Sequence, residues 1–176
     1  MAEDVGGQTV RTITRRLMPL FCIMYLIAFI DRQNVSYAKL DMVGALGLSE
    51  TAYGLGASLF FIGYFFFEAP SNVILAKVGA RIWFTRIMVT WGMVTVALGF
   101  TQNQAMFYVL RFALGAAEAG FFPGVIYYFT RWLPSAERGK AIALFLSGSA
   151  IASILSGPLS GALMKTSLLG LKGWQS

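Results

Sequence analysis

Residues 106–129 read MFYVLRFALGAAEAGFFPGVIYYF, a run of 24 residues in which only Arg111 and Glu118 carry charge. A helix needs about 20 mostly apolar residues to cross the roughly 30 Å of hydrocarbon in a bilayer. We therefore predict a transmembrane helix here. Four further apolar runs predict the same structure, at residues 17–38, 53–76, 82–100 and 141–164. Five such spans indicate an all-α integral membrane protein.

The composition supports this fold class and excludes several others. Apolar residues make up 57% of the 176 residues and charged residues only 12%, whereas about a quarter of the residues in a soluble domain are charged. The chain has no histidine and one cysteine, Cys22. A disulfide framework, a zinc cluster and histidine-based catalysis are therefore excluded. We predict no enzyme and no cofactor or metal, and any coupling ion is expected to be a proton carried by carboxylates.

The basic residues predict the orientation. Nine lysines and arginines fall in the tail and loops on the side of the membrane that holds the N-terminus, against three on the opposite side. The positive-inside rule then places the N-terminus in the cytoplasm. Residues 1–16 are expected to form a cytoplasmic tail and residues 165–176 an outer-side segment leading to a missing sixth helix. The first run is too long for a signal peptide and lacks a cleavage site, so it is expected to stay in the inner membrane.

The net charge of +6 does not predict nucleic-acid binding. A phosphate-binding surface needs basic residues gathered on one soluble face. Here the basic residues fall between apolar runs, where the lipid bilayer is the expected surroundings.

Apart from Glu68 and Arg86, which lie toward the cytoplasmic ends of their spans, four charged residues lie inside the predicted spans: Asp31, Arg32, Arg111 and Glu118. Each costs about 2.5 to 3.5 kcal/mol at the centre of a bilayer unless something compensates for it. Arg111 and Glu118 are two helical turns apart, which places them on one helix face with about 10 Å between them. In the functional interpretation, the arginines bind an anionic substrate and the carboxylates carry protons. In the alternative, the four side chains form structural ion pairs between helices.

Other polar residues inside the spans are weaker candidates. Tyr64 lies centrally in its span, where a role at the membrane interface explains it poorly, so it is a candidate for substrate contact. Ser149 and Ser153 are candidates for lining the substrate path, although serines in membrane helices commonly bond to their own helix. Glu68 lies near the cytoplasmic end of its span, where a functional role and simple access to the interface are equally compatible with the sequence.

Small residues in the spans predict close helix packing and a bend. Gly115, Ala119, Gly120 and Gly124 are expected to let helix backbones approach closely. The pair Gly157–Pro158 is expected to bend its helix. The run at 82–100 is expected to be a peripheral helix that faces lipid and has no functional role.

Four short motifs follow one another along the chain. They are FIDRQN at 29–34, GYFFFEAPSN at 63–72, RFALG at 111–115 followed by EAGFFPG at 118–124, and GPLSG at 157–161. In this order they resemble helices 1, 2, 4 and 5 of the major facilitator superfamily, and more narrowly its anion:cation symporter family. The resemblance covers nearly the whole chain. It implies the N-terminal helix bundle of such a transporter, with five of twelve spans present and a C-terminal bundle missing.

The resemblance also implies a function. The family takes up organic anions, such as sugar acids, tartrate or aromatic carboxylates, by proton symport and alternating access between two bundles. Asp31 and Glu118 would carry protons, while Arg32, Arg111 and Tyr64 would surround the substrate. The remaining matched positions would have structural or gating roles: Glu68, Gly79, Arg81, Gly157 and Pro158.

The sequence departs from the family pattern at two positions. The loop AKVGAR at 76–81 has an alanine where the superfamily motif commonly has an aspartate, and Phe29 stands where relatives often have a tyrosine. Two alternatives to transport therefore stay open. The chain could be a non-transporting membrane subunit whose charges pair with a partner, or an inert truncated fragment.

Overall fold

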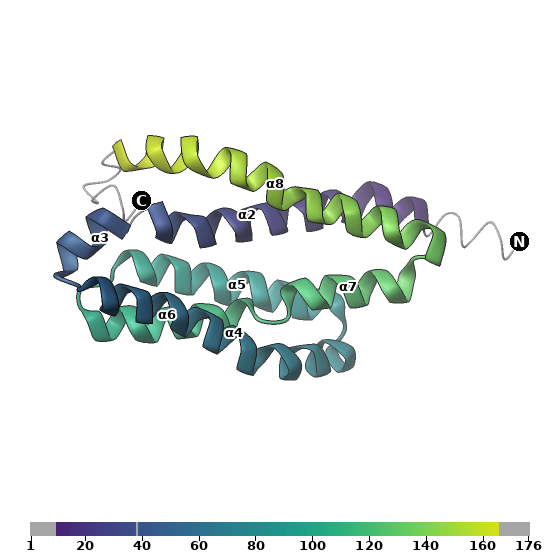
Figure 1. Cartoon of the computed structure of the whole chain (residues 1–176). Coiled ribbons are helices and arrows are strands. Elements are labelled where there is room, and N and C mark those ends of the chain that lie inside the picture. Colours follow the sequence, from purple (N-terminus) through teal and green to yellow (C-terminus); the bar gives the residue numbers. More distant parts are fainter. Residues whose placement is uncertain (1–9, 38, 166–176) are drawn as a thin grey trace, which may run out of the picture. The chain divides into compact units, whose positions relative to one another are not determined.

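The structure, a computed structural model, describes residues 10–37 and 39–165. Every regular element in these ranges is a helix (Figure 1): η1 (Ile13–Leu17), α2 (Met18–Tyr37), α3 (Lys39–Leu46), α4 (Glu50–Val78), α5 (Ala80–Gly99), α6 (Gln104–Glu118), α7 (Phe121–Trp132) and α8 (Ser135–Lys165). Parts of the predicted N-terminal tail (1–9) and of the outer-side segment (166–176) lie outside the described residues.

The chain divides into two compact units. Unit 1 comprises Met1–Ser36 and Val125–Leu159, and unit 2 comprises Tyr37–Gly124 and Ser160–Ser176. Unit 1 therefore holds most of α2 and α8, and unit 2 holds α4, α5 and α6.

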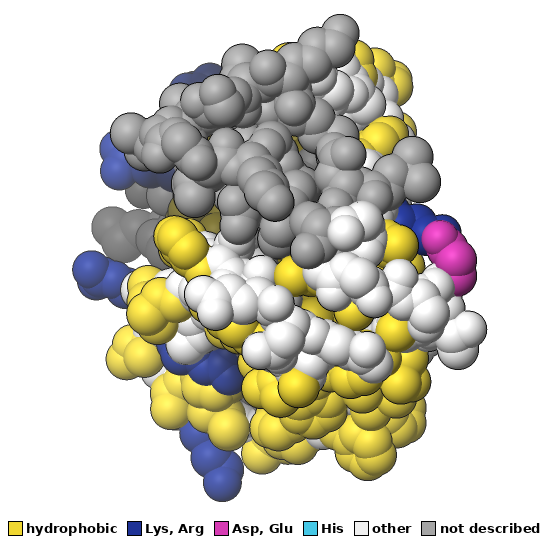
Figure 2. All heavy atoms as spheres, turned by 90° about the vertical axis from the view of Figure 1, so that its left-hand side faces the viewer, with side chains coloured by type: hydrophobic (Ala, Val, Ile, Leu, Met, Phe, Trp, Pro, Cys, Tyr) yellow, Lys and Arg dark blue, Asp and Glu magenta, His cyan; other side chains and the backbone are white. Residues whose placement is uncertain are grey.

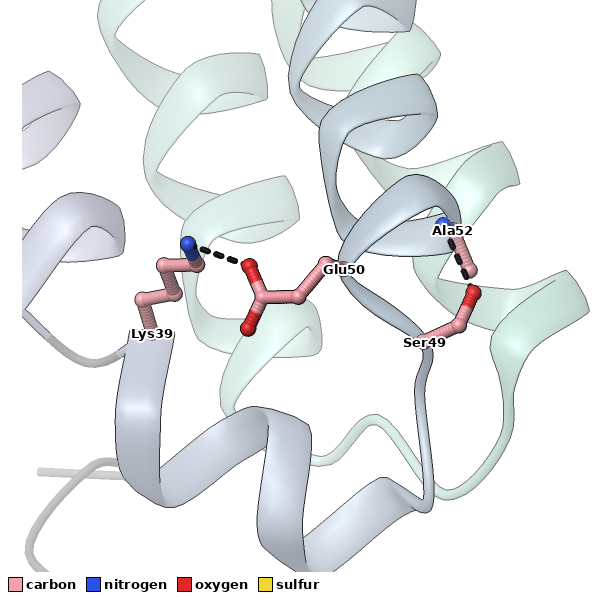
Figure 3. Close-up of polar contacts among 4 residues, drawn as sticks. All are labelled: Lys39, Ser49, Glu50 and Ala52. Carbon is pink, nitrogen blue, oxygen red and sulfur yellow. Dashed lines mark hydrogen bonds and ion pairs between the residues drawn. The ribbon is translucent and has the colours of Figure 1, made fainter.

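Five helical stretches are long and apolar enough to cross a membrane: Val10–Tyr37, Glu50–Val78, Ala80–Gly99, Gln104–Trp132 and Ser135–Ala162. They confirm the predicted all-α membrane fold. Each begins before the predicted apolar run, and at α4 and α6 a polar cap marks the first helical residue. The Ser49 hydroxyl accepts a hydrogen bond from the Ala52 amide at 3.0 Å (Figure 3). Asn103 Oδ1 accepts one from the Met106 amide at 2.9 Å.

A short helix, α3, occupies residues that were predicted to be a loop. Its first residue, Lys39, forms an ion pair with Glu50 at the start of α4, at 2.5 Å (Figure 3). The Lys39 ammonium also lies 5.5 Å from the centre of the Tyr53 ring. The link between the first two spans is therefore an ordered helix held to the start of α4.

The predicted helix over 106–129 is interrupted. α6 ends at Glu118 and α7 begins at Phe121, and Gly120 between them has a φ of +84°. A left-handed backbone of this kind is open to glycine but costly for residues with a Cβ. The prediction of one continuous helix is thus wrong at Ala119–Gly120. The reason lies in contacts with α4 and α5 that periodicity does not reveal.

Unit 2 is built by packing α6 against α4 and α5. Small residues make this possible. A Cβ added at Gly115 would lie 2.0 Å from the Phe60 carbonyl oxygen, and one added at Gly63 would lie 2.3 Å from the Phe112 carbonyl oxygen. The backbones of α4 and α6 therefore touch directly, which confirms the role predicted for Gly115. Gly120 differs, since it forms the interruption.

Unit 1 is held by aromatic side chains from α2, the end of α7 and α8. The Phe21 ring meets the Phe129 ring edge-on at 5.7 Å between centroids. The Tyr25 and Phe145 rings lie 4.5 Å apart. The Phe129 and Phe145 rings are 6.1 Å apart in an edge-on arrangement. Such pairs contribute packing area and favourable ring electrostatics to the contact between helices.

Apolar side chains also cover much of the surface. Figure 2 shows hydrophobic side chains over the lower part of the described surface that faces the viewer. Phe65 on α4 and Ile154 on α8 are each 74% exposed. An apolar surface of this extent suits lipid contact and not water.

α5 was predicted to be a peripheral helix that faces lipid. Its exposed Val89 and Val96 agree with this, but Trp83, Phe84, Ile87 and Trp91 are buried. The expectation is wrong for that side of the helix, because the side packs against α6.

Candidate functional site

The most enclosed ionisable residues of the described chain lie on α6. Arg111 is 5% exposed and Glu118 is 1% exposed. They are seven residues apart on one helix, about 10 Å along its axis. Their joint burial agrees with the predicted single face. The Arg111 guanidinium lies 4.9 Å from the centre of the Phe60 ring on α4, within the range of a cation–π contact.

Tyr64 comes to the same part of unit 2 from α4. The close approach at Gly115 involves its backbone, because a Cβ added there would lie 2.9 Å from the Tyr64 amide nitrogen. Gly115 lies between Arg111 and Glu118 on α6. The Tyr64 ring also lies 6.2 Å from the Phe60 ring. The structure therefore brings Tyr64 beside the stretch of α6 that carries both ionisable residues.

The second ionisable set lies in unit 1. Asp31 and Arg32 are half-buried on α2. Directly after them, Gln33 Nε2 donates a hydrogen bond of 3.4 Å to the Ser153 hydroxyl on α8. Sequence reasoning missed Gln33, although its place in the FIDRQN motif was a usable signal.

Ser149 and Ser153 follow the local pattern that competes with a substrate role. The Ser149 hydroxyl donates to the Leu146 carbonyl at 2.7 Å. The Ser153 hydroxyl donates to the Ser149 carbonyl at 2.9 Å. Both protons are thus used within α8, as is common for serine in membrane helices. These hydroxyl oxygens can therefore only accept a hydrogen bond from another group. The Ser153 oxygen already accepts one from Gln33.

The predicted structural and gating residues lie elsewhere. Glu68 is half-buried on α4, and its carbonyl accepts a hydrogen bond of 2.9 Å from Asn72 Nδ2. Gly79 forms the turn between α4 and α5 with a φ of +87°, a conformation that explains the glycine. Arg81 follows on the exposed side of α5. α8 continues through Gly157 and Pro158 to Lys165.

A polar contact that the sequence analysis did not find lies at the end of α6. The buried Ser71 hydroxyl donates to the Ala119 carbonyl at 2.8 Å. The Ser71 hydroxyl oxygen in turn accepts a hydrogen bond of 2.9 Å from the Trp83 indole nitrogen. This contact joins α4 and α5 to the interruption that directly follows Glu118.

Within residues 10–37 and 39–165, no group of three or more His, Cys, Asp or Glu side chains is placed to hold a metal ion.

Comparison with known proteins gives a consistent result. Residues 21–176 match the family described as Major Facilitator Superfamily. The chain is 49% identical over 176 residues to a putative tartrate transporter of Agrobacterium vitis, covering 99% of this chain and 39% of the relative. It is 53% identical over 165 residues to the putative metabolite transport protein NicT of Pseudomonas putida, covering 93% and 38%. It is 50% identical over 173 residues to a quinolone resistance transporter of Acinetobacter baumannii, covering 98% and 40%.

A solved structure has the same fold. A bacterial homologue of the human lysosomal transporter Spinster, in an inward-facing and occupied conformation, superimposes with a TM-score of 0.81 at 19% identity, covering 93% of this chain and 40% of that one. The chain thus spans about two fifths of the length of the relatives that it matches.

Proposed function

Because the chain belongs to the Major Facilitator Superfamily, a family of transporters and not enzymes, we propose that it forms the N-terminal part of a transporter that takes up organic anions by proton symport. The observation that carries the proposal is the joint burial of Arg111 and Glu118 on α6, beside Tyr64. An arginine and a carboxylate inside a membrane bundle combine an anion-binding group with a proton-binding group. The relatives named for tartrate and metabolite transport support a small organic substrate.

The arginines would bind the substrate. A guanidinium is always charged and donates two parallel hydrogen bonds to a carboxylate. Arg111 is enclosed by protein and lies over the Phe60 ring, so water competes little with a bound anion. Tyr64 would supply a hydroxyl beside α6, and Arg32 on α2 is the second residue proposed to bind the anion.

The carboxylates would couple this binding to protons. A buried charge is expensive unless a proton or an opposite charge neutralises it. Protonation of Glu118 and Asp31 would leave the arginines to hold the substrate, and the neutralised site could then change the side to which it opens. Proton release in the cytoplasm would restore the charges on the carboxylates and displace the anion. The expected setting is the inner membrane, with the N-terminus in the cytoplasm.

The test separates substrate exchange from concentrative uptake in vesicles that contain the protein at its native length. Glu118→Gln and Asp31→Asn remove the titrating group but keep the size of the side chain. Each variant should exchange labelled organic anion across the membrane yet lose about 90% or more of the accumulation driven by a pH gradient, a change of at least 1.4 kcal/mol. The matched control is Glu137→Gln, since Glu137 is paired only with Lys140 at 3.5 Å within the start of α8 in the described structure. Unchanged accumulation in both variants would contradict the proposal.

A further experiment concerns the second bundle, which we propose completes the transport unit. An antibody against residues 130–140 would measure the size of the polypeptide in its own membranes. A species of more than twice the 19.2 kDa of this sequence supports a transporter with both bundles in one chain. A species near 19.2 kDa would favour the alternative of a membrane subunit or an inert fragment.

A further inference from the structure

The end of α6 has polar contacts to which the proposed function gives no role. Ala119 has φ −55° and ψ 135°, and Gly120 has a φ of +84°, so the helix stops directly after Glu118. The last carbonyls of a helix have no donor within it. Inside a membrane they need donors from neighbouring helices, because no water is there to replace them.

The first of these carbonyls belongs to Ala119. In a continuous helix it would accept from residue 123, but Pro123 has no N–H. The Ser71 hydroxyl of α4 supplies the missing donor at 2.8 Å. The Trp83 indole of α5 donates to the same hydroxyl at 2.9 Å. Since that bond occupies an acceptor site of the oxygen, it directs the Ser71 proton toward Ala119.

The second carbonyl belongs to Ala117. Its helical donor would be the amide of Phe121, which lies beyond the interruption. The Arg86 guanidinium of α5 donates to this carbonyl from Nη1 at 3.3 Å. The same guanidinium lies 4.2 Å from the centre of the Trp83 ring, in cation–π contact. Trp83 thus supports both donors.

Gly120 shows that the fit is close. A Cβ added there would lie 2.1 Å from the Ser71 hydroxyl oxygen and 2.5 Å from the Ser71 Cβ. The chain turns against Ser71 with no room for a side chain. Beyond this turn, the Gly124 amide bonds to the Gly120 carbonyl at 3.0 Å and α7 begins.

We propose that Ser71, Trp83 and Arg86, here called the α6 cap, are positioning residues that hold Glu118 in place for proton coupling. Glu118 is the last residue of α6. The Ala119 amide after it still bonds to the Gly115 carbonyl at 3.0 Å, and the α6 cap supplies donors to the carbonyls of the residues on either side of Glu118, Ala117 and Ala119. This inference rests on the proposed role of Glu118 as a proton carrier. It also assigns a function to α5, which the sequence analysis expected to have none.

The first experiment measures coupling in vesicles with the protein at its native length. Ser71→Ala removes the hydroxyl, and Trp83→Phe removes the N–H but keeps an aromatic ring. Each should lower the ratio of pH-driven accumulation to exchange about fivefold, the effect of one lost hydrogen bond. A merely structural role would lower both rates together and leave the ratio unchanged.

The controls repeat the same chemical changes away from the α6 cap. Ser58→Ala removes a hydroxyl that donates to the Gly54 carbonyl of its own helix at 2.9 Å. Trp132→Phe changes an exposed tryptophan at the end of α7. Neither should alter the ratio.

The second experiment does not depend on transport. Cys22 is the only cysteine of this sequence. With Cys22 and any cysteine beyond these 176 residues changed to serine, Glu118→Cys introduces a single thiol at a position that is 1% exposed. Its reaction with a small maleimide should be slow. Adding Ser71→Ala or Trp83→Phe should raise the rate about fivefold, and the two control changes should not.

The two experiments separate the proposals. An unchanged thiol rate would overturn the α6 cap. A faster thiol reaction with an unchanged coupling ratio, in a protein that Glu118→Gln does uncouple, would overturn the positioning role. If Glu118→Gln still concentrates substrate while the thiol rate rises, the α6 cap stands and the proton role of Glu118 fails.

Discussion

The two ionisable sets differ in how the helices around them meet. In unit 2, Arg111 and Glu118 lie on α6 on either side of Gly115, where the backbones of α4 and α6 touch. In unit 1, Asp31 and Arg32 are half-buried on α2. In the same unit, a Cβ added at Gly148 on α8 would lie 3.3 Å from the Tyr25 ring and 3.6 Å, an ordinary contact distance, from the Cys22 carbonyl oxygen. Backbone cannot move aside, whereas a ring can. We infer that the α6 set is held rigidly and the α2 set adaptably.

The largest expected difference between the two units is in how much one added methyl group destabilises each of them. Gly115→Ala puts a Cβ 2.0 Å from the Phe60 carbonyl oxygen, and separating the two helices should cost about 3 kcal/mol of unfolding free energy. Gly148→Ala needs only a small shift of the Tyr25 ring and should cost less than about 1 kcal/mol. Unfolding by denaturant in detergent micelles measures both.

The control for this pair is Gly92→Ala on α5, where an added Cβ meets nothing within 4 Å. Removing a glycine from a helix interior should leave stability unchanged or raise it by up to about 1 kcal/mol. Equal losses at Gly115 and Gly148 would show that the two units do not differ in rigidity.

A second difference is expected in substrate binding, when each arginine is replaced by lysine. Lysine keeps the charge but loses the planar pair of donors. At Arg111, which is enclosed and stacked on Phe60, no water can replace the lost hydrogen bond. Arg111→Lys should therefore raise the KM for anion exchange about tenfold, and Arg32→Lys at the half-buried position about threefold. The measurement is exchange of labelled anion in vesicles as a function of its concentration.

Equal effects at the two positions would show that burial does not decide the strength of anion binding. Little change at Arg111 together with normal accumulation would favour the structural interpretation of that residue. Folded yield on size-exclusion chromatography distinguishes a loss of binding from a loss of protein.

Much of the fold could be predicted because the bilayer imposes a simple requirement. Long apolar runs identified five spans, and the shared face of Arg111 and Glu118 followed from their spacing alone. The helix starts at Ser49 and Asn103 were missed because hydrophobicity marks the membrane-crossing part of a helix and not its cap.

The interruption of α6 shows where prediction failed. Ala119 and Gly120 directly follow Glu118 in the run at 106–129, which was predicted to be one helix. Pro123 was a usable signal, since it removes the donor for the Ala119 carbonyl. The donor that replaces it comes from Ser71, 48 residues earlier, and no local pattern encodes that distance. The buried side of α5 was missed for the same reason.

The smallest expected effect concerns a charged pair outside the packed interior, which contrasts with both sets inside the spans. The side chains of Lys39 and Glu50 are 37% and 69% exposed. The hydrogen bond to Glu50, and then its charge, raise the pKa of Lys39 above its ordinary value of 10.5. Exposed pairs of this kind contribute little because water and salt screen them.

The sign of the pH dependence follows from the raised pKa. Folding favours protonated Lys39, so its contribution is complete below pH 10.5, the ordinary lysine value, and is lost as the pH rises through the higher value of the folded state. Glu50→Gln should remove this loss. Melting temperatures in detergent between about pH 8 and pH 11 should converge for the native chain and the variant at the alkaline end. A difference that grows with pH would contradict the assignment, and added salt should reduce the difference at pH 8 if the pair acts through its exposed charges.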